Sequence, residues 1–237
     1  MSLHSFRSFA LAAFAFALAL LPGTAAAQRP AYTAVEQTLD VDPPGVDCVA
    51  TPGGCFKIHW VTSTGDAPAA TDVDPANGRA DYIDQVAQSV AEVYVREIRN
   101  FGWPAPPSDA ISATPGGDGR HDVYVRNVSC GGIAFVQGEG AVAPGSSSWY
   151  SFTTLGRDMR TCYAGLSGPG DLSTMSQLDV IRDVFAHEYH HAIQLGMQRG
   201  GTGAFREATA NWMNDEAYDG LNAVSYTHLT LPTILRV

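Results

Sequence analysis

The pentapeptide His187-Glu188-Tyr189-His190-His191 places two histidines four residues apart, with a glutamate directly after the first. Positions i and i+4 lie on one face of an α-helix, so both imidazoles can reach one metal ion. Zinc accepts two such nitrogens, and the adjacent carboxylate can take a proton from a water at that ion. The pattern therefore predicts a helical zinc site with His187 and His191 as ligands and Glu188 as general base.

The residues around this pentapeptide have the pattern of a helix. Ser176 fits an N-cap, Asp179 can complete a weak capping box three residues later, and Gly196 can end the helix. Apolar residues recur between these limits at helical spacing, namely Leu178, Ile181, Val184, Phe185, Ala192 and Leu195. The motif therefore lies inside a predicted helix, as its chemistry requires.

A zinc hydrolase needs a third protein ligand, with water in the fourth position. After a polar, glycine-rich turn, a second helix is predicted from about Ala204 to Tyr218, and Glu207 lies near its start. An antiparallel return of the chain can bring this carboxylate to the metal. Asp215 and Glu216 are alternatives two turns further along.

Two neighbours of these residues have open roles. Asn211 lies four residues after Glu207 on the same helical face, where it can accept a hydrogen bond from the distal ring N–H of a ligand histidine. A core or solvent-facing position explains Asn211 equally well. His190 points about 100° away from His191, so we expect a neighbour rather than a ligand, with a His187/His190 pair as the alternative.

The segments HEYHHAIQ (187–194) and REATANWM (206–213) resemble the gluzincin metallopeptidases, in particular a group of bacterial exported metalloproteases typified by a myxobacterial protein. The segment DPANGRADY (74–82) is similar to the same group, so the resemblance covers roughly residues 56–222. It implies an α+β, zincin-like catalytic domain with a small mixed sheet. It also implies zinc held by His187, His191 and Glu207, with Glu188 as general base in the hydrolysis of protein or peptide substrates.

Two features depart from the family pattern. The segment before Glu207 is shorter than in thermolysin-like members, and Asn211 stands where many gluzincins carry an aspartate. Both weaken the likeness to thermolysin more than they weaken the zinc assignment. The sequence does not identify the residue that stabilises the oxyanion: Tyr218 is one candidate, and a residue in the missing C-terminal part is the alternative.

The two ends of the chain have features of their own. Residues 1–27 resemble a signal peptide, since Arg7 precedes an apolar run and an alanine-rich cleavage site. We therefore expect a secreted or periplasmic protein with no membrane span after signal removal. Residues 28–55 are predicted as a lead-in segment and residues 56–223 as the catalytic domain, C-terminally truncated. Residues 224–237 resemble a translated sequencing adapter, which removes His228 as a ligand candidate.

Cysteine content and charge limit the class of protein. Four cysteines fit two disulfides in an oxidising compartment. The simplest of the three possible connectivities joins Cys48 to Cys55 and Cys130 to Cys162. A cysteine zinc site is the competing interpretation, but no C-x-x-C spacing occurs. The net charge of −10 argues against nucleic acid or an anionic membrane surface as the main partner, and the oligomeric state is not indicated.

Other segments show simpler patterns. Alternation predicts a half-buried strand over 56–60, and helical spacing predicts a helix over 83–101. Strands are predicted over 123–128 and 148–152, joined by a loop rich in glycine, serine and alanine. The strand over 148–152 is a candidate for pairing with extended substrate.

Four polar residues surround an Asn-Gly turn, and their oxygen atoms could bind calcium: Asp72, Asp74, Asn77 and Asp81. Their spacing departs from the EF-hand loop, and the final glutamate of that loop is missing. A polar turn and helix N-cap explains the same residues, so both interpretations stay open.

Two other functions compete with an exported zinc endopeptidase. The first is an exported binding or surface module with a structural or vestigial zinc site, which predicts zinc uptake without hydrolysis. The second is a metal-free globular domain, which predicts no stoichiometric zinc.

Overall fold

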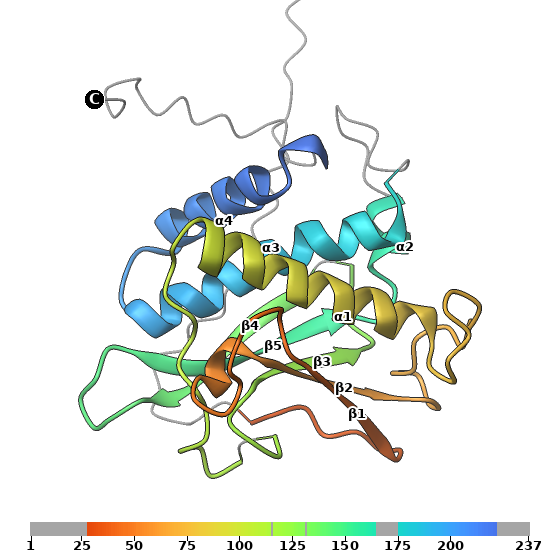
Figure 1. Cartoon of the computed structure of the whole chain (residues 1–237), viewed down its shortest axis with the longest axis horizontal. Helices are drawn as coiled ribbons and strands as arrows, with labels where there is room; N and C mark the ends of the chain where they lie inside the picture. Colours follow the sequence, from red (N-terminus) through yellow and green to blue (C-terminus); the bar gives the residue numbers. More distant parts are fainter. Residues whose placement is uncertain (1–27, 115, 131, 165–174, 222–237) are drawn as a thin grey trace, which may run out of the picture.

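A five-stranded mixed sheet carries the helices on one side in the computed structural model of this α+β protein (Figure 1). The structure describes residues 28–114, 116–130, 132–164 and 175–221. The predicted signal peptide and the predicted tail with His228 lie outside the described residues.

The sheet has the strand order β1-β2-β3-β5-β4. Its strands are β1 (Glu36–Val41), β2 (Phe56–Val61), β3 (His121–Arg126), β4 (Ala134–Ala141) and β5 (Trp149–Gly156). Strands β2, β3 and β5 run parallel, while β1 and β4 pair antiparallel at the two edges. Strand β4 is therefore an edge of the sheet, and β5 is paired on both sides.

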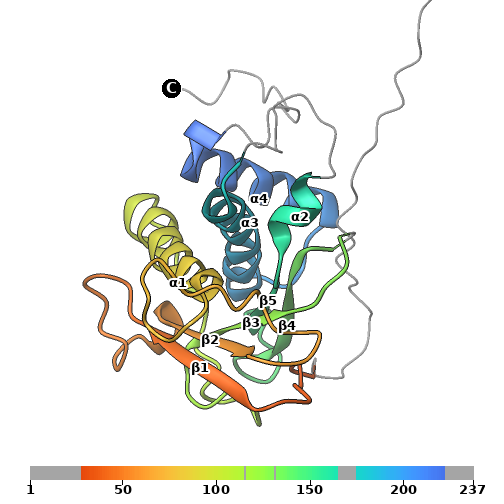
Figure 2. The same cartoon turned by 90° about the vertical axis from the view of Figure 1, so that its right-hand side faces the viewer.

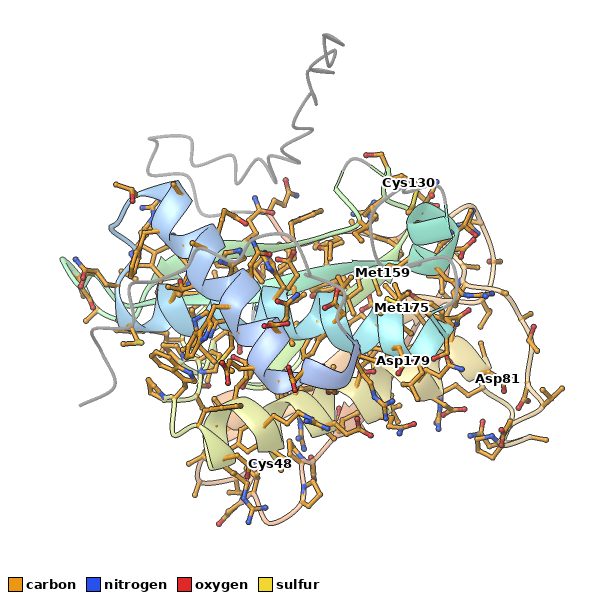
Figure 3. The ribbon with its side chains drawn as sticks, turned by 90° about the horizontal axis from the view of Figure 1, so that it is seen from above. Cys48, Asp81, Cys130, Met159, Met175 and Asp179 are labelled. Carbon is orange, nitrogen blue, oxygen red and sulfur yellow. A yellow bond between two sulfur atoms is a disulfide. The ribbon has the colours of Figure 1, made fainter. Side chains whose placement is uncertain are left out.

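The helices form a second and a third layer. They are α1 (Asp81–Tyr94), which continues as a π-helical turn over Val95–Asn100, then α2 (Met159–Ala164), α3 (Gln177–Met197) and α4 (Gly203–Ala217). Helices α1 and α3 lie side by side over the sheet, and α4 packs against α3 (Figure 2). Asp81 and Asp179, near the starts of α1 and α3, lie toward the same end of the molecule (Figure 3).

The hydrophobic core fills the space between the sheet and the helices. Alternate residues of β2 point toward α3, where the Phe56 ring lies 5.8 Å from Phe185 and 5.3 Å from Tyr189 between ring centroids. The N-cap of α3 forms as predicted, because the Ser176 side chain accepts a hydrogen bond from the Asp179 N–H. Packing and capping together hold the motif-bearing helix on the sheet.

The prediction of a loop between residues 128 and 148 is wrong in part, because residues 134–141 form strand β4. Its two glycines lowered the strand signal, but one of them, Gly140, serves the packing of this edge. A Cβ atom at Gly140 would collide with the Tyr150 hydroxyl. Gly196 likewise does not end α3, which extends to Met197; a Cβ there would lie 2.6 Å from Pro107 Cδ, so glycine permits a close loop approach.

The N-terminal segment covers the face of the sheet opposite the helices. The predicted lead-in contributes β1 to the same sheet, and its Tyr32 hydroxyl contacts the backbone oxygens of His59 (2.9 Å) and Val125 (2.8 Å). Arg29 extends into a group of carboxylates on this face. Strand β2 is consequently buried on both faces, although its alternation had predicted a half-buried strand.

Both predicted disulfides are present. Cys48 pairs with Cys55, and Cys130 pairs with Cys162. This is the simplest of the three connectivities and fits an oxidising compartment. Within the described ranges, no helix is long and apolar enough to cross a membrane.

Candidate metal centre

Three side chains from two neighbouring helices bring their ligand atoms together. His187 and His191 lie one turn apart on α3, and Glu207 lies near the start of α4. The two Nε2 atoms are 3.1 Å apart. Glu207 Oε2 lies 3.3 Å from His187 Nε2, and Glu207 Oε1 lies 3.4 Å from His191 Nε2. The structure thus brings together the three residues predicted as metal ligands.

These distances fit one small metal ion. Zinc binds nitrogen and carboxylate oxygen at about 2.0–2.2 Å, so neighbouring ligands on a tetrahedral ion stand about 3.4 Å apart. Both histidine side chains are buried, whereas the Glu207 side chain is 23% exposed. The cluster therefore has the spacing of a tetrahedral site with three protein ligands and an approach from solvent on the glutamate side.

Burial and hydrogen bonding act against each other in this cluster. Burial would raise the pKa of Glu207, but its contacts with His187 and His191 outweigh burial and hold this pKa at about 2. Burial would lower the pKa of His187, yet the hydrogen bond to Glu207 leaves it raised. Both shifts express the same preference for positive charge at the point where the three side chains meet.

Glu188 is buried beside the ligands but is not one of them. Burial raises its pKa, and the charges of His187 and His191 act in the opposite direction. A backbone hydrogen bond from Val136 on β4 also reaches this carboxylate. Glu188 therefore lies between the metal cluster and the edge strand of the sheet.

Each ligand histidine has an outer partner on α3. Gln194 Oε1 lies 2.9 Å from His191 Nδ1. Asp183, one turn before His187, is one of the charges that raise the pKa of that histidine. Asn214 on α4 in turn donates a hydrogen bond to Asp183 at 3.0 Å. The hydrogen-bond acceptor for His191 Nδ1 is thus Gln194 rather than Asn211. Gln194 lies three residues after His191, on the same face of α3.

His190 lies outside the cluster, as its helical angle predicted. Its Nδ1 lies 3.1 Å from Glu97 Oε2, and its ring packs edge-on against Trp103 at 5.1 Å between centroids. Burial lowers the pKa of His190 to about 3 and raises the pKa of Glu97 well above its usual value. The alternative His187/His190 pair therefore does not form.

Asp215 and Glu216, the alternative third ligands, belong to neither group of possible metal ligands in the described residues. Glu216 accepts a hydrogen bond from Trp212 Nε1 at 3.2 Å, away from the histidines. Asp42, Cys48 and Cys55 form the other group of possible ligands in the described part of the chain, but both sulfur atoms belong to a disulfide. None of these residues competes with the cluster on α3 and α4.

Tyr218, the candidate for oxyanion stabilisation, lies at the far end of α4. The Arg96 guanidinium stacks over its ring, 4.3 Å from the centroid. Burial raises the pKa of Tyr218, and the charges that modify this effect are those of Glu92, Arg96, Arg182 and Glu97. None of these residues belongs to the metal cluster, so this environment gives no support for the oxyanion role.

The polar residues around the Asn-Gly turn form hydrogen bonds within their own loop. Asp72 accepts from the N–H groups of Asn77 and Gly78, and Asp81 accepts from those of Val73 and Asp74. These bonds match the polar-turn part of the interpretation. The N-cap part is wrong, because the N-cap of α1 is Ala80 and no side chain caps this helix. Calcium binding near Asp72, Asp74, Asn77 and Asp81 stays a prediction, which metal analysis of the protein can test.

Three comparisons were made, with models of protein families, with curated proteins and with solved structures, and none gave a match. The assignment of function therefore depends on the chemistry and geometry of the site.

Proposed function

We propose that this chain is an exported, zinc-dependent endopeptidase with a zincin-like fold. The observation that carries the proposal is the convergence of His187, His191 and Glu207 at ligand spacing, with Glu188 beside them. Two histidines and one carboxylate on two helices are the ligand set of a catalytic zinc site, which leaves a position for water. The two disulfides support the exported part of the proposal.

The residues of the site divide the chemistry between them. When bound, zinc would polarise the substrate carbonyl and lower the pKa of a water molecule. Glu188 takes the proton of the attacking water and returns it to the leaving amine. Burial raises the pKa of Glu188, which favours a carboxylate that can hold this proton between the two steps.

Strand β4 is the element we assign to substrate. The predicted pairing strand, 148–152, lies largely within β5, where residues 149–152 pair with β4 and residues 153–156 pair with β3. Strand β4 is the outer strand, and its Val136 backbone already contacts Glu188. An extended peptide added to β4 would place its carbonyl groups next to the general base.

The proposal is tested by zinc content and hydrolysis of an unfolded protein substrate, measured on the wild type and two variants. Glu188→Gln should bind one zinc per chain and lose nearly all activity, because only the proton acceptor is removed. Glu216→Gln, an exposed change on α4, should keep both properties. Zinc binding without hydrolysis in the wild type would support a binding module with structural zinc, and no zinc at all would support a metal-free domain.

A further inference from the structure

One amide group, that of Gln194, contacts both helices that carry the candidate ligands. Its oxygen lies 2.9 Å from His191 Nδ1 and 3.3 Å from Arg206 Nε. Its nitrogen donates to the backbone oxygen of Arg206 at 3.1 Å and to Thr209 Oγ1 at 2.7 Å. The side chain therefore uses both ends of its amide, one toward His191 and the other toward α4.

The orientation of the Gln194 amide follows from partners that can act only as a hydrogen-bond donor or only as an acceptor. The backbone oxygen of Arg206 only accepts hydrogen bonds, so the NH₂ group of Gln194 must face it. The Arg206 Nε–H only donates, so the amide oxygen must lie on that side. The Thr209 hydroxyl can donate to the backbone oxygens of Phe205 (3.0 Å) and Arg206 (3.1 Å), which leaves it as an acceptor toward Gln194.

This orientation determines the tautomer of His191. A neutral imidazole has one N–H and one lone pair, and the nitrogen that faces an amide oxygen must carry the hydrogen. Nδ1 of His191 is thus the donor, and Nε2 keeps its lone pair. Nε2 is also the atom that lies 3.1 Å from His187 Nε2 and 3.4 Å from Glu207.

The other end of the amide acts on the third ligand. Arg206 directly precedes Glu207, and Thr209 follows it by two residues. Hydrogen bonds to these two residues hold the first turns of α4 against α3 and so limit where the Glu207 carboxylate can lie. Arg206 is itself buried in this contact, at 3% exposure, which leaves little room for the turn to shift.

We propose that Gln194 is the positioning residue of the site, which sets the metal-binding tautomer of His191 and holds the helix of Glu207 at ligand distance. The inference rests on the proposed metal site and names a residue outside the predicted set of ligands and base. Outer partners of this kind typically change metal affinity by about 10- to 100-fold when they are removed.

The test uses Gln194→Leu, Gln194→Glu and, as a control, Gln198→Leu at the exposed end of α3. The measurements are zinc affinity by competition with a chelator and the ¹⁵N chemical shifts of the imidazoles in the metal-free protein, in mildly alkaline buffer. Gln194→Leu should mix the two tautomers of His191 and weaken zinc binding about 10- to 100-fold. Gln194→Glu keeps an acceptor oxygen, so the tautomer and most of the zinc affinity should be retained. In Gln194→Glu, amide hydrogen exchange in the first turns of α4 should become faster, because the NH₂ group that donates to α4 is lost.

Two results would overturn the inference. One is unchanged zinc affinity and unchanged imidazole shifts in Gln194→Leu. The other is a wild-type protein whose His191 carries its proton on Nε2, a result that needs no variant to fold. Failure of the proposed function has a different signature, because an inactive wild type that binds zinc leaves these measurements intact. A wild type that binds no zinc refutes the peptidase, while the tautomer of the metal-free protein still decides the role of Gln194.

Discussion

Arg29 and Asp122 form a buried ion pair on the face of the sheet opposite the candidate metal centre. The same guanidinium contacts Asp109 and lies 2.6 Å from Glu139 Oε1, so the carboxyl groups of three residues surround one cation. His59 adds a contact from its Nε2 to Asp122 at 2.6 Å. This group joins the segment before β1 to β2, β3, β4 and the loop that precedes β3.

Arg29→Ala should destabilise the protein strongly, because it leaves buried carboxylates without their cation. Removal of one partner from a buried ion pair costs about 3–5 kcal/mol. The free energy of unfolding, measured by denaturant titration, should fall by this amount. Arg99→Ala is the control, since Arg99 is exposed and donates a hydrogen bond to the Pro44 backbone oxygen at 2.6 Å. Equal small losses in both variants would show that the Arg29 group contributes little.

Asp109 should make stability depend on pH. Burial, reinforced by the charge of Asp122 and opposed by Arg29, raises its pKa to about 8, against about 3.9 in an unfolded chain. Between these values the folded state binds the proton that the unfolded state has released, so stability falls as pH rises through this window. Thermal unfolding of wild type and Asp109→Asn from pH 5 to pH 8 should show a flatter curve for the variant. The same dependence of the unfolding temperature on pH in both proteins would contradict the raised pKa of Asp109.

Glu207→Gln should weaken zinc binding by more than the roughly 10- to 100-fold expected of an outer partner, because it removes the charge of a direct ligand. The pKa of about 2 means that the carboxylate stays ionised throughout the physiological range, since its contacts with His187 and His191 outweigh burial. Chelator competition measures the loss, and Asp215→Asn on the same helix is the matched change. A larger loss in Asp215→Asn would move the third ligand to that residue.

The two disulfides should differ in what they contribute to stability. The chain-entropy relation gives about 3.7 kcal/mol for a loop the length of Cys130–Cys162 and about 2.4 kcal/mol for one the length of Cys48–Cys55. Their sequence separations are 32 and 7 residues. Replacement of each pair by serine, followed by denaturant titration, should therefore destabilise the longer loop more. The reverse order would mean that loop length does not decide their contributions.

Several features of the site were predictable from short stretches of sequence. The helix around His187 and His191 follows from apolar spacing and from the Ser176 cap, which act within a few residues of each other. Glu207 was predictable because a single short turn joins its helix to the previous one. Disulfide pairing over the shortest loops was also correct.

Other features depend on contacts between distant segments. Strand β4 has a weak strand pattern because it contains glycines, and at Gly140 a side chain would collide with Tyr150, a neighbour that is identified only in the folded sheet. Gln194 lies three residues after His191 on α3, but its contact with Thr209 forms only because α4 packs against α3. The Arg29 group assembles residues separated by 80 to 110 positions in the chain.

The sequence by itself determined the helical metal motif, the identity of the third ligand candidate and the pairing of cysteines, because these depend on local periodicity and short loops. Only the tertiary structure decided which side chains support the ligands, which strand is free at the edge and what fills the opposite face of the sheet. The physical reason is that hydrogen-bond partners and buried ion pairs are selected by three-dimensional proximity, which the topology of the chain creates and local spacing does not encode.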